Sequence, residues 1–177
     1  VQKMKKILAM LLALVMVMGL VACGGNSTPE TTGTPNESTP AVDGTEYKIA
    51  MITDYGDITD QSFNQTTYEA CKAYCEAEGI DFTYYKPNGD STAERVAMVE
   101  KADDEGYNVI VMPGYAFGGT VAEAAPQYPD IKFIALDVSK GDLLEGGVAL
   151  KGESYDYNPD NWDLSKYVYM DNVYCAI

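Results

Sequence analysis

The residues best suited to bind a ligand lie together in the segment 53–65, TDYGDITDQSFNQ. This segment is typical of a glycine-containing loop that opens a helix, with Phe63 and Asn64 in the first helical turn. A flat polar ring can stack on the Phe63 face while the Asp54 carboxylate and the Asn64 amide hydrogen-bond its edge. The same pattern also allows Phe63 to be a hydrophobic staple or a core residue.

Two other kinds of chemistry fit the sequence less well. A helix N-terminus here can hold a phosphate, but Asp54, Asp57 and Asp60 lie close by without a cation. Asp54 with Asp57 or Asp60 can form an acid and base pair. The chain has no histidine, no G-x-S-x-G and no G-x-x-x-x-G-K, which excludes serine–histidine triads, histidine-ligated zinc and phosphate-binding loops. We expect a binding protein without a cofactor or a metal.

The charge balance is strongly acidic, with 12 Lys and Arg against 27 Asp and Glu and a net charge of −15. Nucleic-acid binding needs clustered cations, so it is not expected. An acidic surface also repels an anionic lipid face. Any membrane attachment must therefore come from another part of the chain.

The candidate residues need elements that position them, and strands and helices alternate along the rest of the sequence. Short apolar runs predict strands, and segments with helical spacing of apolar residues lie between them. The predicted strands are 47–53, 81–86, 108–112 and 131–136, and the predicted helices are 62–78, 91–106 and 120–127. This alternation predicts an α/β fold, a doubly wound parallel sheet with right-handed crossovers.

Polar residues follow three of these strands. Asp54 comes after the first strand, Tyr115 after the third and Asp137 after the fourth. Ligands of such sheets sit at the carboxyl ends of the strands. We therefore expect these residues to meet at one edge of the sheet, although an Asp after a strand can also simply form a turn or a helix cap.

The first 46 residues are typical of an export signal and a tether. Lysines at positions 3, 5 and 6 precede the apolar run 7–21, and LVACGG follows at 20–25. That motif resembles a bacterial lipobox, so we expect a signal peptide over 1–22 and lipidation of Cys23 on the extracytoplasmic face; the alternative is an ordinary signal peptide with a chance cysteine. Residues 23–46, rich in Ser, Thr, Pro and Gly, are expected to be a disordered linker.

Residues 54–64 resemble the D-x-G-x-x-x-D-x-S-F-N segment of the basic membrane protein family. These are lipid-anchored, nucleoside-binding proteins that serve ABC transporters. The resemblance runs over 47–137 and resumes at 172–174. It implies the N-terminal lobe of a type I periplasmic-binding-protein-like fold over 47–177, with the second lobe absent and the chain truncated.

The resemblance also implies roles for individual residues. Phe63 would stack on the nucleobase, while Asp54 and Asn64 would hydrogen-bond the edge of the base. Asp137 would approach the ribose hydroxyls. Tyr115 and Phe117 would belong to the pocket wall.

The family closes two lobes on its ligand, so one lobe alone is expected to bind a nucleoside weakly or not at all. It is also expected to expose an apolar sheet edge. The ABC permease and the membrane are the implied partners. A surface receptor of the same fold, which senses a ligand for signalling, is the alternative function.

One region departs from the family. Residues 139–171 are expected to be an exposed, turn-rich insertion pinned by Trp162. Within it, 156–160 imitates the start of a calcium loop, but Asn161 stands in place of the turn glycine. Cys71 and Cys75, four residues apart on a predicted helix, are expected to be small buried hydrophobes rather than a metal or redox pair.

Overall fold

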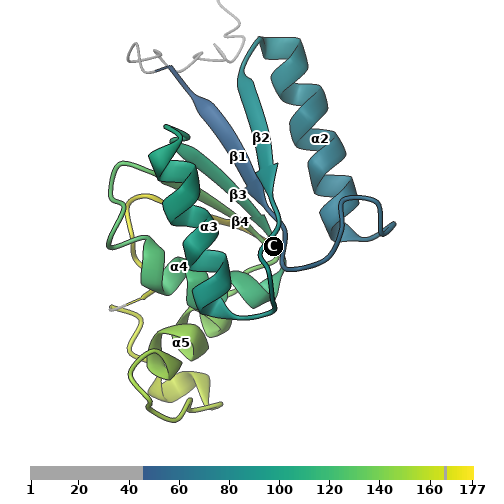
Figure 1. Cartoon of the computed structure of the whole chain (residues 1–177). Helices are drawn as coiled ribbons and strands as arrows, with labels where there is room; N and C mark the ends of the chain where they lie inside the picture. The colour runs from purple at the N-terminus through teal and green to yellow at the C-terminus, as the bar shows by residue number, and fades with distance from the viewer. Residues whose placement is uncertain (1–45, 166) are drawn as a thin grey trace, which may run out of the picture. The chain divides into compact units, whose positions relative to one another are not determined.

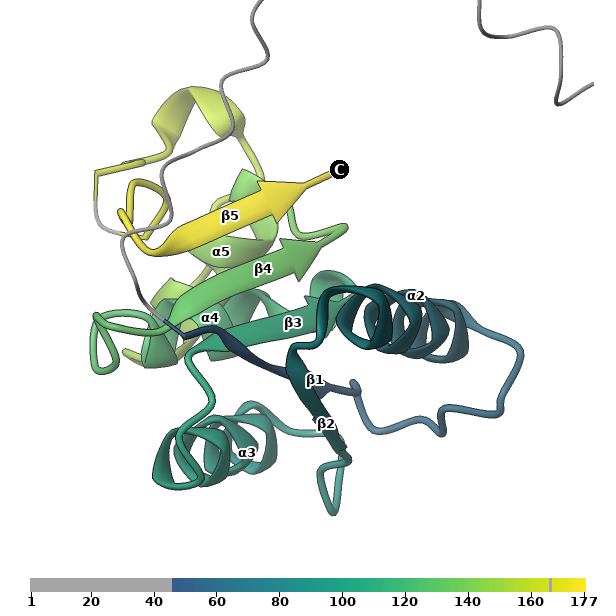
Figure 2. The same cartoon turned by 90° about the horizontal axis from the view of Figure 1, so that it is seen from above.

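The computed structural model describes residues 46–165 and 167–177. The predicted signal peptide, the predicted lipidation site Cys23 and the predicted linker up to residue 45 lie outside the described residues. The described part contains one parallel sheet with the strand order β2-β1-β3-β4-β5 (Figures 1 and 2). Its strands are β1 (Lys48–Ile52), β2 (Asp81–Tyr85), β3 (Val109–Pro113), β4 (Lys132–Leu136) and β5 (Val173–Ala176).

Four α-helices connect the strands: α2 (Phe63–Glu78), α3 (Thr92–Asp104), α4 (Gly118–Ala124) and α5 (Lys140–Ala149). The chain steps from β1 to β2 in one direction across the sheet and then from β2 through β3 and β4 to β5 in the other. Right-handed crossovers therefore place α2 on one face and the other three helices on the opposite face. Figure 1 shows α2 on the right of the sheet, apart from α3, α4 and α5. The predicted doubly wound α/β sheet is confirmed.

The helix ends follow from capping chemistry. The Ser62 hydroxyl accepts a hydrogen bond from the backbone N–H of Asn64 at the start of α2, and Gly79 ends that helix with a left-handed φ of 69°. At the start of α3 the Ser91 hydroxyl accepts from the Glu94 N–H. These caps satisfy backbone groups that a helix leaves unpaired, and they set the predicted helix boundaries within a residue or two.

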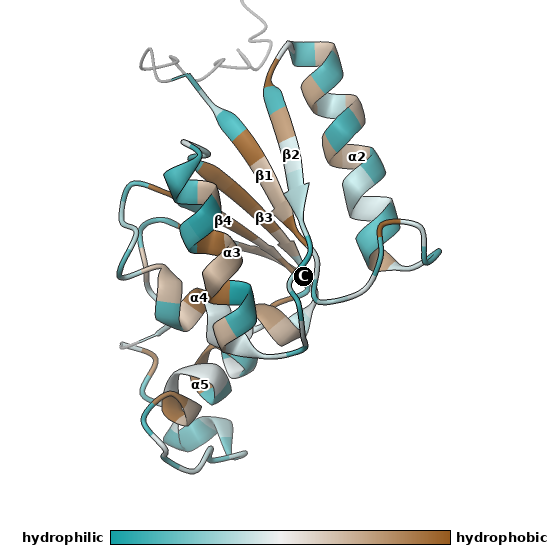
Figure 3. Cartoon of the chain, viewed as in Figure 1, coloured by the Kyte–Doolittle hydropathy of each residue, from teal (hydrophilic) through white to brown (hydrophobic). Residues whose placement is uncertain are grey.

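The hydrophobic core lies between the sheet and helices α3, α4 and α5. All five residues of β3 are buried, as expected for the central strand of a parallel sheet. Figure 3 shows hydrophobic colour concentrated on the central strands. On the α2 side, a hollow of about 420 Å³ is lined mainly by apolar side chains from several strands, including Ile49, Val109 and Ile134. None of the helices in the described part is long and apolar enough to cross a bilayer.

The expectation that 139–171 is turn-rich throughout is wrong for its first part, which forms α5. Ser139 and Asp142 form a complete capping box, and Leu143 is buried. Sequence reasoning missed the helix because glycine weakens helix propensity. Gly146 is required by packing, since a Cβ there would lie 2.3 Å from the Cα of Gly119 in α4. The insertion itself stays a prediction.

Candidate functional site

The strand order reverses between β1 and β3, and this point is where open α/β sheets bind ligands. Asp54, Tyr115 and Asp137 follow β1, β3 and β4 within one or two residues. Backbone bonds align these strand ends, because the N–H of Gly114 donates to the Leu136 carbonyl at 2.8 Å. The prediction that the three polar residues share one edge of the sheet is confirmed.

Asp54 is fixed by an array of hydrogen bonds. Its Oδ1 accepts from the backbone N–H groups of Tyr55 at 2.6 Å and Gly56 at 2.8 Å, and from the Asn64 amide at 2.8 Å. Asn64 Oδ1 in turn accepts from the Asp54 N–H at 3.3 Å. Oδ2 of Asp54 has no hydrogen bond to any of the described residues, so this oxygen can accept from a ligand.

Asn64 itself is buried, with 4% of its surface exposed. Its amide oxygen and amide nitrogen both hydrogen-bond Asp54, and the nitrogen also lies 3.5 Å from Asp60 Oδ2. In this structure Asn64 therefore positions the Asp54 carboxylate. Direct contact between Asn64 and a ligand stays a prediction.

The loop leaves no room for a side chain at Gly56. A Cβ there would lie 2.7 Å from Nδ2 of Asn64 and 2.8 Å from Oδ2 of Asp60. Asp60 also accepts from the Ser62 N–H at 2.9 Å, and so joins this loop to the cap of α2. The glycine of the sequence motif is thus a requirement of close packing around Asp54.

Phe63 is the first residue of α2 and 44% of its surface is exposed. It does not belong to the hydrophobic core cluster, so the alternative that places it in the core is wrong. Its neighbour Asn64 is bound to Asp54, which ties the start of α2 to the end of β1. The start of α2, which carries this exposed ring, thus lies at the switch point.

The other two aromatic candidates differ from each other. Tyr115, at the start of the 3-10 turn η1 (Tyr115–Phe117), is 70% exposed. Phe117 is fully buried in the core. The prediction that Phe117 belongs to the pocket wall is therefore corrected: the turn directs its ring inward, where it supports the edge from below. Asp137 is exposed and holds a left-handed φ of 56°, which Asp tolerates better than most residues.

Arg95, the only arginine of the chain, was missed by sequence reasoning. Its side chain is buried on α3, and Nε donates to the Asp54 carbonyl at 2.9 Å. One terminal nitrogen donates to the Ala116 carbonyl at 3.4 Å and the other pairs with Asp90. Arg95 therefore bridges the loops after β1 and β3. The signal was its place on the buried face of α3, in helical register with Val99.

The carboxylates of this edge favour a ligand that donates hydrogen bonds. Burial opposes ionisation of Asp54, but the bonds from Gly56, Tyr55 and Asn64 and the charge of Arg95 outweigh it and lower its pKa. The hydrogen bond from the Ser62 hydroxyl lowers the pKa of Asp60. Both groups are ionised at neutral pH and accept hydrogen bonds only. An acid and base pair needs pKa values pushed apart, and this geometry does not provide that.

The other sequence candidates have structural roles. Burial, with the nearby Cys75, raises the pKa of Cys71 to about 11, and Cys75 is buried. In the calcium-like segment, Asp156 accepts from the Asn158 N–H and the Asn161 amide, so local turns occupy its oxygens. Within 46–165 and 167–177, no cluster of acidic or cysteine side chains could hold a metal ion.

Comparison with known proteins identifies relatives of this chain. A family model described as "ABC transporter substrate-binding protein PnrA-like" matches residues 47–149, more than half of the chain. An uncharacterised lipoprotein of Pyrococcus furiosus is 28% identical over 106 residues, which are 59% of this chain and 26% of that protein. A nucleoside-binding ABC transporter protein of Lactococcus lactis, BmpA, is 25% identical over 130 residues, 71% of this chain and 34% of the relative.

A CD4+ T-cell-stimulating antigen of Listeria innocua is 27% identical over 139 residues, 75% of this chain and 37% of the antigen. Among solved structures, a solute-binding protein of an ABC transporter system from Aeropyrum pernix is 26% identical, with a TM-score of 0.47 over 52% of this chain and 25% of that one. The chain thus covers between 26% and 37% of the length of these curated relatives.

Proposed function

The chain belongs to the PnrA-like family of ABC transporter substrate-binding proteins, and from this membership we propose that it forms one wall of a purine nucleoside site in a lipid-anchored uptake protein. The parallel five-stranded sheet confirms the expected α/β fold class, and we propose that it is the N-terminal lobe of a type I periplasmic-binding-protein-like fold, as the family suggests. The nucleoside, the permease partner and the anchor belong to the proposal.

The observation that carries the proposal is an exposed aromatic ring at the start of α2, one residue before Asn64, whose amide binds the ionised Asp54 at the switch point. The Phe63 ring is partly exposed, and Oδ2 of Asp54 accepts no hydrogen bond from the described residues. A purine offers a flat ring for stacking and N–H donors at its edge. BmpA of L. lactis, a relative over 71% of this chain, is named as nucleoside-binding.

Delivery at a membrane is supported by the N-terminal sequence and by the relatives. The basic start, the apolar run and Cys23 predict lipidation. Relatives from Pyrococcus furiosus and Pyrococcus abyssi are named as lipoproteins. We therefore place the folded part on the extracytoplasmic side, where it would present its ligand to the permease. Sensing by a receptor of the same fold stays the alternative.

A titration followed by amide chemical shifts tests the proposal. Adenosine, inosine, adenine and ribose are added separately to the ¹⁵N-labelled chain. The purine nucleosides should shift amides of 53–64 and of the residues after β3 and β4, with weak affinity because closure by a second lobe contributes to capture. Ribose alone should have a much smaller effect. Absence of shifts at millimolar nucleoside, or shifts confined to other surfaces, would overturn the proposal.

A matched pair of variants locates the stacking ring. Phe63→Leu removes the aromatic face from the first turn of α2, whereas Tyr74→Leu removes a similarly exposed ring, 56% against 44%, from the same helix. We expect roughly tenfold weaker adenosine binding for the first variant, since stacking on an aromatic side chain contributes about 1–3 kcal/mol per base. The second variant should bind as the parent does.

A further inference from the structure

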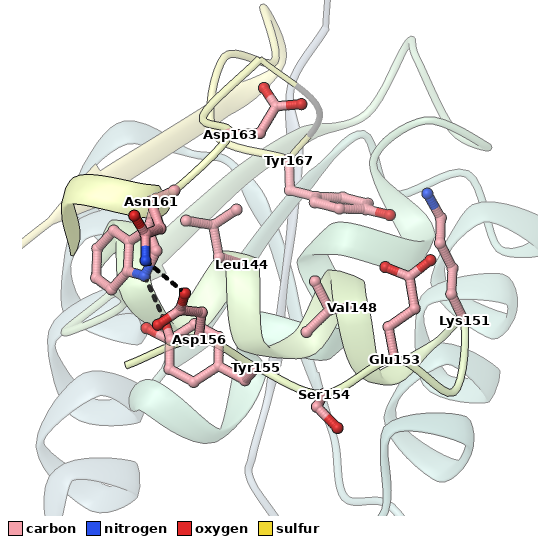
Figure 4. Close-up of a pocket in the computed structure, with 11 residues that line it drawn as sticks. Leu144, Val148, Lys151, Glu153, Ser154, Tyr155, Asp156, Asn161, Asp163 and Tyr167 are labelled. Carbon is pink, nitrogen blue, oxygen red and sulfur yellow. Dashed lines mark hydrogen bonds between the residues drawn. The ribbon is translucent and has the colours of Figure 1, made fainter. Parts of the chain in front are cut away.

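A second concavity lies between α5 and the segment 151–167. It has a volume of about 190 Å³, which is room for about six waters at ~30 Å³ each. None of the residues that line it belongs to the sheet edge described above. Figure 4 shows side chains from α5 forming its floor.

Aromatic rings form the walls of this cavity. Tyr155 and Trp162 form one wall, with ring centroids 5.8 Å apart and planes inclined by 34°. In Figure 4, Tyr155 and Tyr167 lie on either side of Leu144 and Val148, which form the apolar floor. A guest in this cavity would therefore have aromatic rings on two sides and aliphatic carbon beneath it.

Internal hydrogen bonds hold the first wall in place. Trp162 Nε1 donates to the Asp156 carbonyl at 2.6 Å. The Asp156 carboxylate accepts from the Asn158 N–H at 2.9 Å and from the Asn161 amide at 2.8 Å. The rings do not have to be ordered when a ligand arrives, which lowers the entropic cost of binding.

Acidic side chains outnumber basic ones among the described residues that line the cavity. Among the described residues that line it, Glu153, Asp156 and Asp163 are acidic and Lys151 is basic. Hydrogen bonds from Asn158 and Asn161 lower the pKa of Asp156, which keeps that carboxylate ionised at neutral pH.

The protein places its own cation on one of the rings. The Lys151 ammonium lies over Tyr167, 5.2 Å from the ring centroid, within the range of a cation–π interaction. The buried Tyr167 hydroxyl has no hydrogen bond of ordinary geometry to the residues that the structure describes. Its interaction with Lys151 raises the pKa of that ammonium. The cavity thus already shows attraction between its aromatic surface and a positive charge.

We propose that this cavity binds a small organic cation of the alkylammonium class, held between Tyr155, Trp162 and Tyr167 and attracted by the carboxylates. Aromatic faces attract cations through their quadrupole, and most strongly where water is excluded. An anion would meet the carboxylates of Glu153 and Asp156. A neutral molecule of the same shape would gain the apolar contact but not the electrostatic attraction.

Choline and its neutral isostere 3,3-dimethyl-1-butanol test the proposal by titration of the full chain, followed by amide shifts. We expect choline to shift residues 144–167 and to bind at least tenfold more tightly than the isostere. Raising the salt concentration should weaken choline binding. No binding of choline at millimolar concentration, or equal binding of the two molecules, would overturn the proposal.

Two variants with opposite expected effects sharpen the test. Lys151→Gln removes the competing ammonium, so choline should bind about three- to tenfold more tightly, whereas a site for an anion would weaken. Trp162→Leu should weaken choline binding at least tenfold. Tyr169 is an exposed aromatic residue outside the cavity, so Tyr169→Leu is the control and should bind choline as the parent chain does. If Trp162→Leu fails to fold, Lys151→Gln still decides, since unchanged or weaker binding in that variant contradicts the proposal.

Discussion

Replacement of Arg95 by methionine should destabilise the fold and loosen the proposed ligand-binding edge. Methionine preserves much of the buried apolar stem but makes none of the polar contacts. The substitution leaves the Asp54 and Ala116 carbonyls without their donor, on either side of the switch point. It thus separates the packing of α3 from the bridging of the two loops.

The structure sets the size of the effect. The 2.9 Å bond from the cation to the Asp54 carbonyl contributes about 1.5–2 kcal/mol, and the 3.4 Å bond to Ala116 about 0.5 kcal/mol. The pair with Asp90 is worth only about 0.5 kcal/mol, because Asp90 is 58% exposed. The cation–π contact with Phe117, at 5.5 Å, adds about 0.5 kcal/mol. The expected loss in the free energy of unfolding is about 3 kcal/mol.

Urea denaturation followed by circular dichroism measures this loss. The free energy of unfolding falls by about 1.5 kcal/mol per molar urea for a domain of this size, so the urea midpoint should fall by about 2 M. Lys101→Met removes an exposed cation from the same helix, which pairs with Glu105 at 4.0 Å and lies 5.0 Å from the Tyr85 ring centroid. It should lower the free energy of unfolding by no more than about 1 kcal/mol. Equal shifts for the two variants would refute the view that Arg95 bridges the loops.

Three further predictions follow from other local features. Gly56→Ala should lower Tm by about 8 °C, because its Cβ would lie 2.7 Å from Asn64 Nδ2, while Gly89→Ala, where the nearest atom is 3.9 Å away, should leave Tm nearly unchanged. The lowered pKa of Asp54 means that its ionised carboxylate stabilises the fold at neutral pH. This contribution is lost as the pH falls through the folded-state pKa, which lies below the ordinary value of 3.8. The urea midpoint of Asp54→Asn should therefore depend less on pH in that acid range than the midpoint of the parent chain. Cys71, with its pKa raised to about 11 from 9.0, should react with iodoacetamide at pH 8 about 100-fold more slowly than in the unfolded chain, measured by mass spectrometry.

The sequence was sufficient for features that depend on local chemistry. The apolar runs predicted four strands, and Ser62 and Gly79 marked the ends of α2 because a hydroxyl and a glycine supply the caps that a helix needs. The placement of Asp54 and Asp137 at one edge followed from the alternation of strands and helices, since parallel strands end on the same side.

Features that depend on distant contacts were not predictable in this way. Arg95 lies 41 residues from the carbonyl that it binds. The inward direction of Phe117 depends on the turn after β3. The glycines of α5 weaken its helical signal, and only the folded chain shows the reason: Gly146 lies against α4, and Gly147 lies against the Tyr167 ring. Likewise, the exposed ring of Phe63 is set by where the start of α2 lies against the end of β1.

The central claim is that a purine lies against the Phe63 ring with its edge at Asp54. The most direct measurement is the transferred nuclear Overhauser effect between adenosine and the chain at millimolar ligand. We predict cross-peaks from the adenine H2 and H8 protons to the Phe63 ring protons. These cross-peaks should disappear in the Phe63→Leu variant. Cross-peaks of adenosine to other aromatic rings, with none to Phe63, would contradict it.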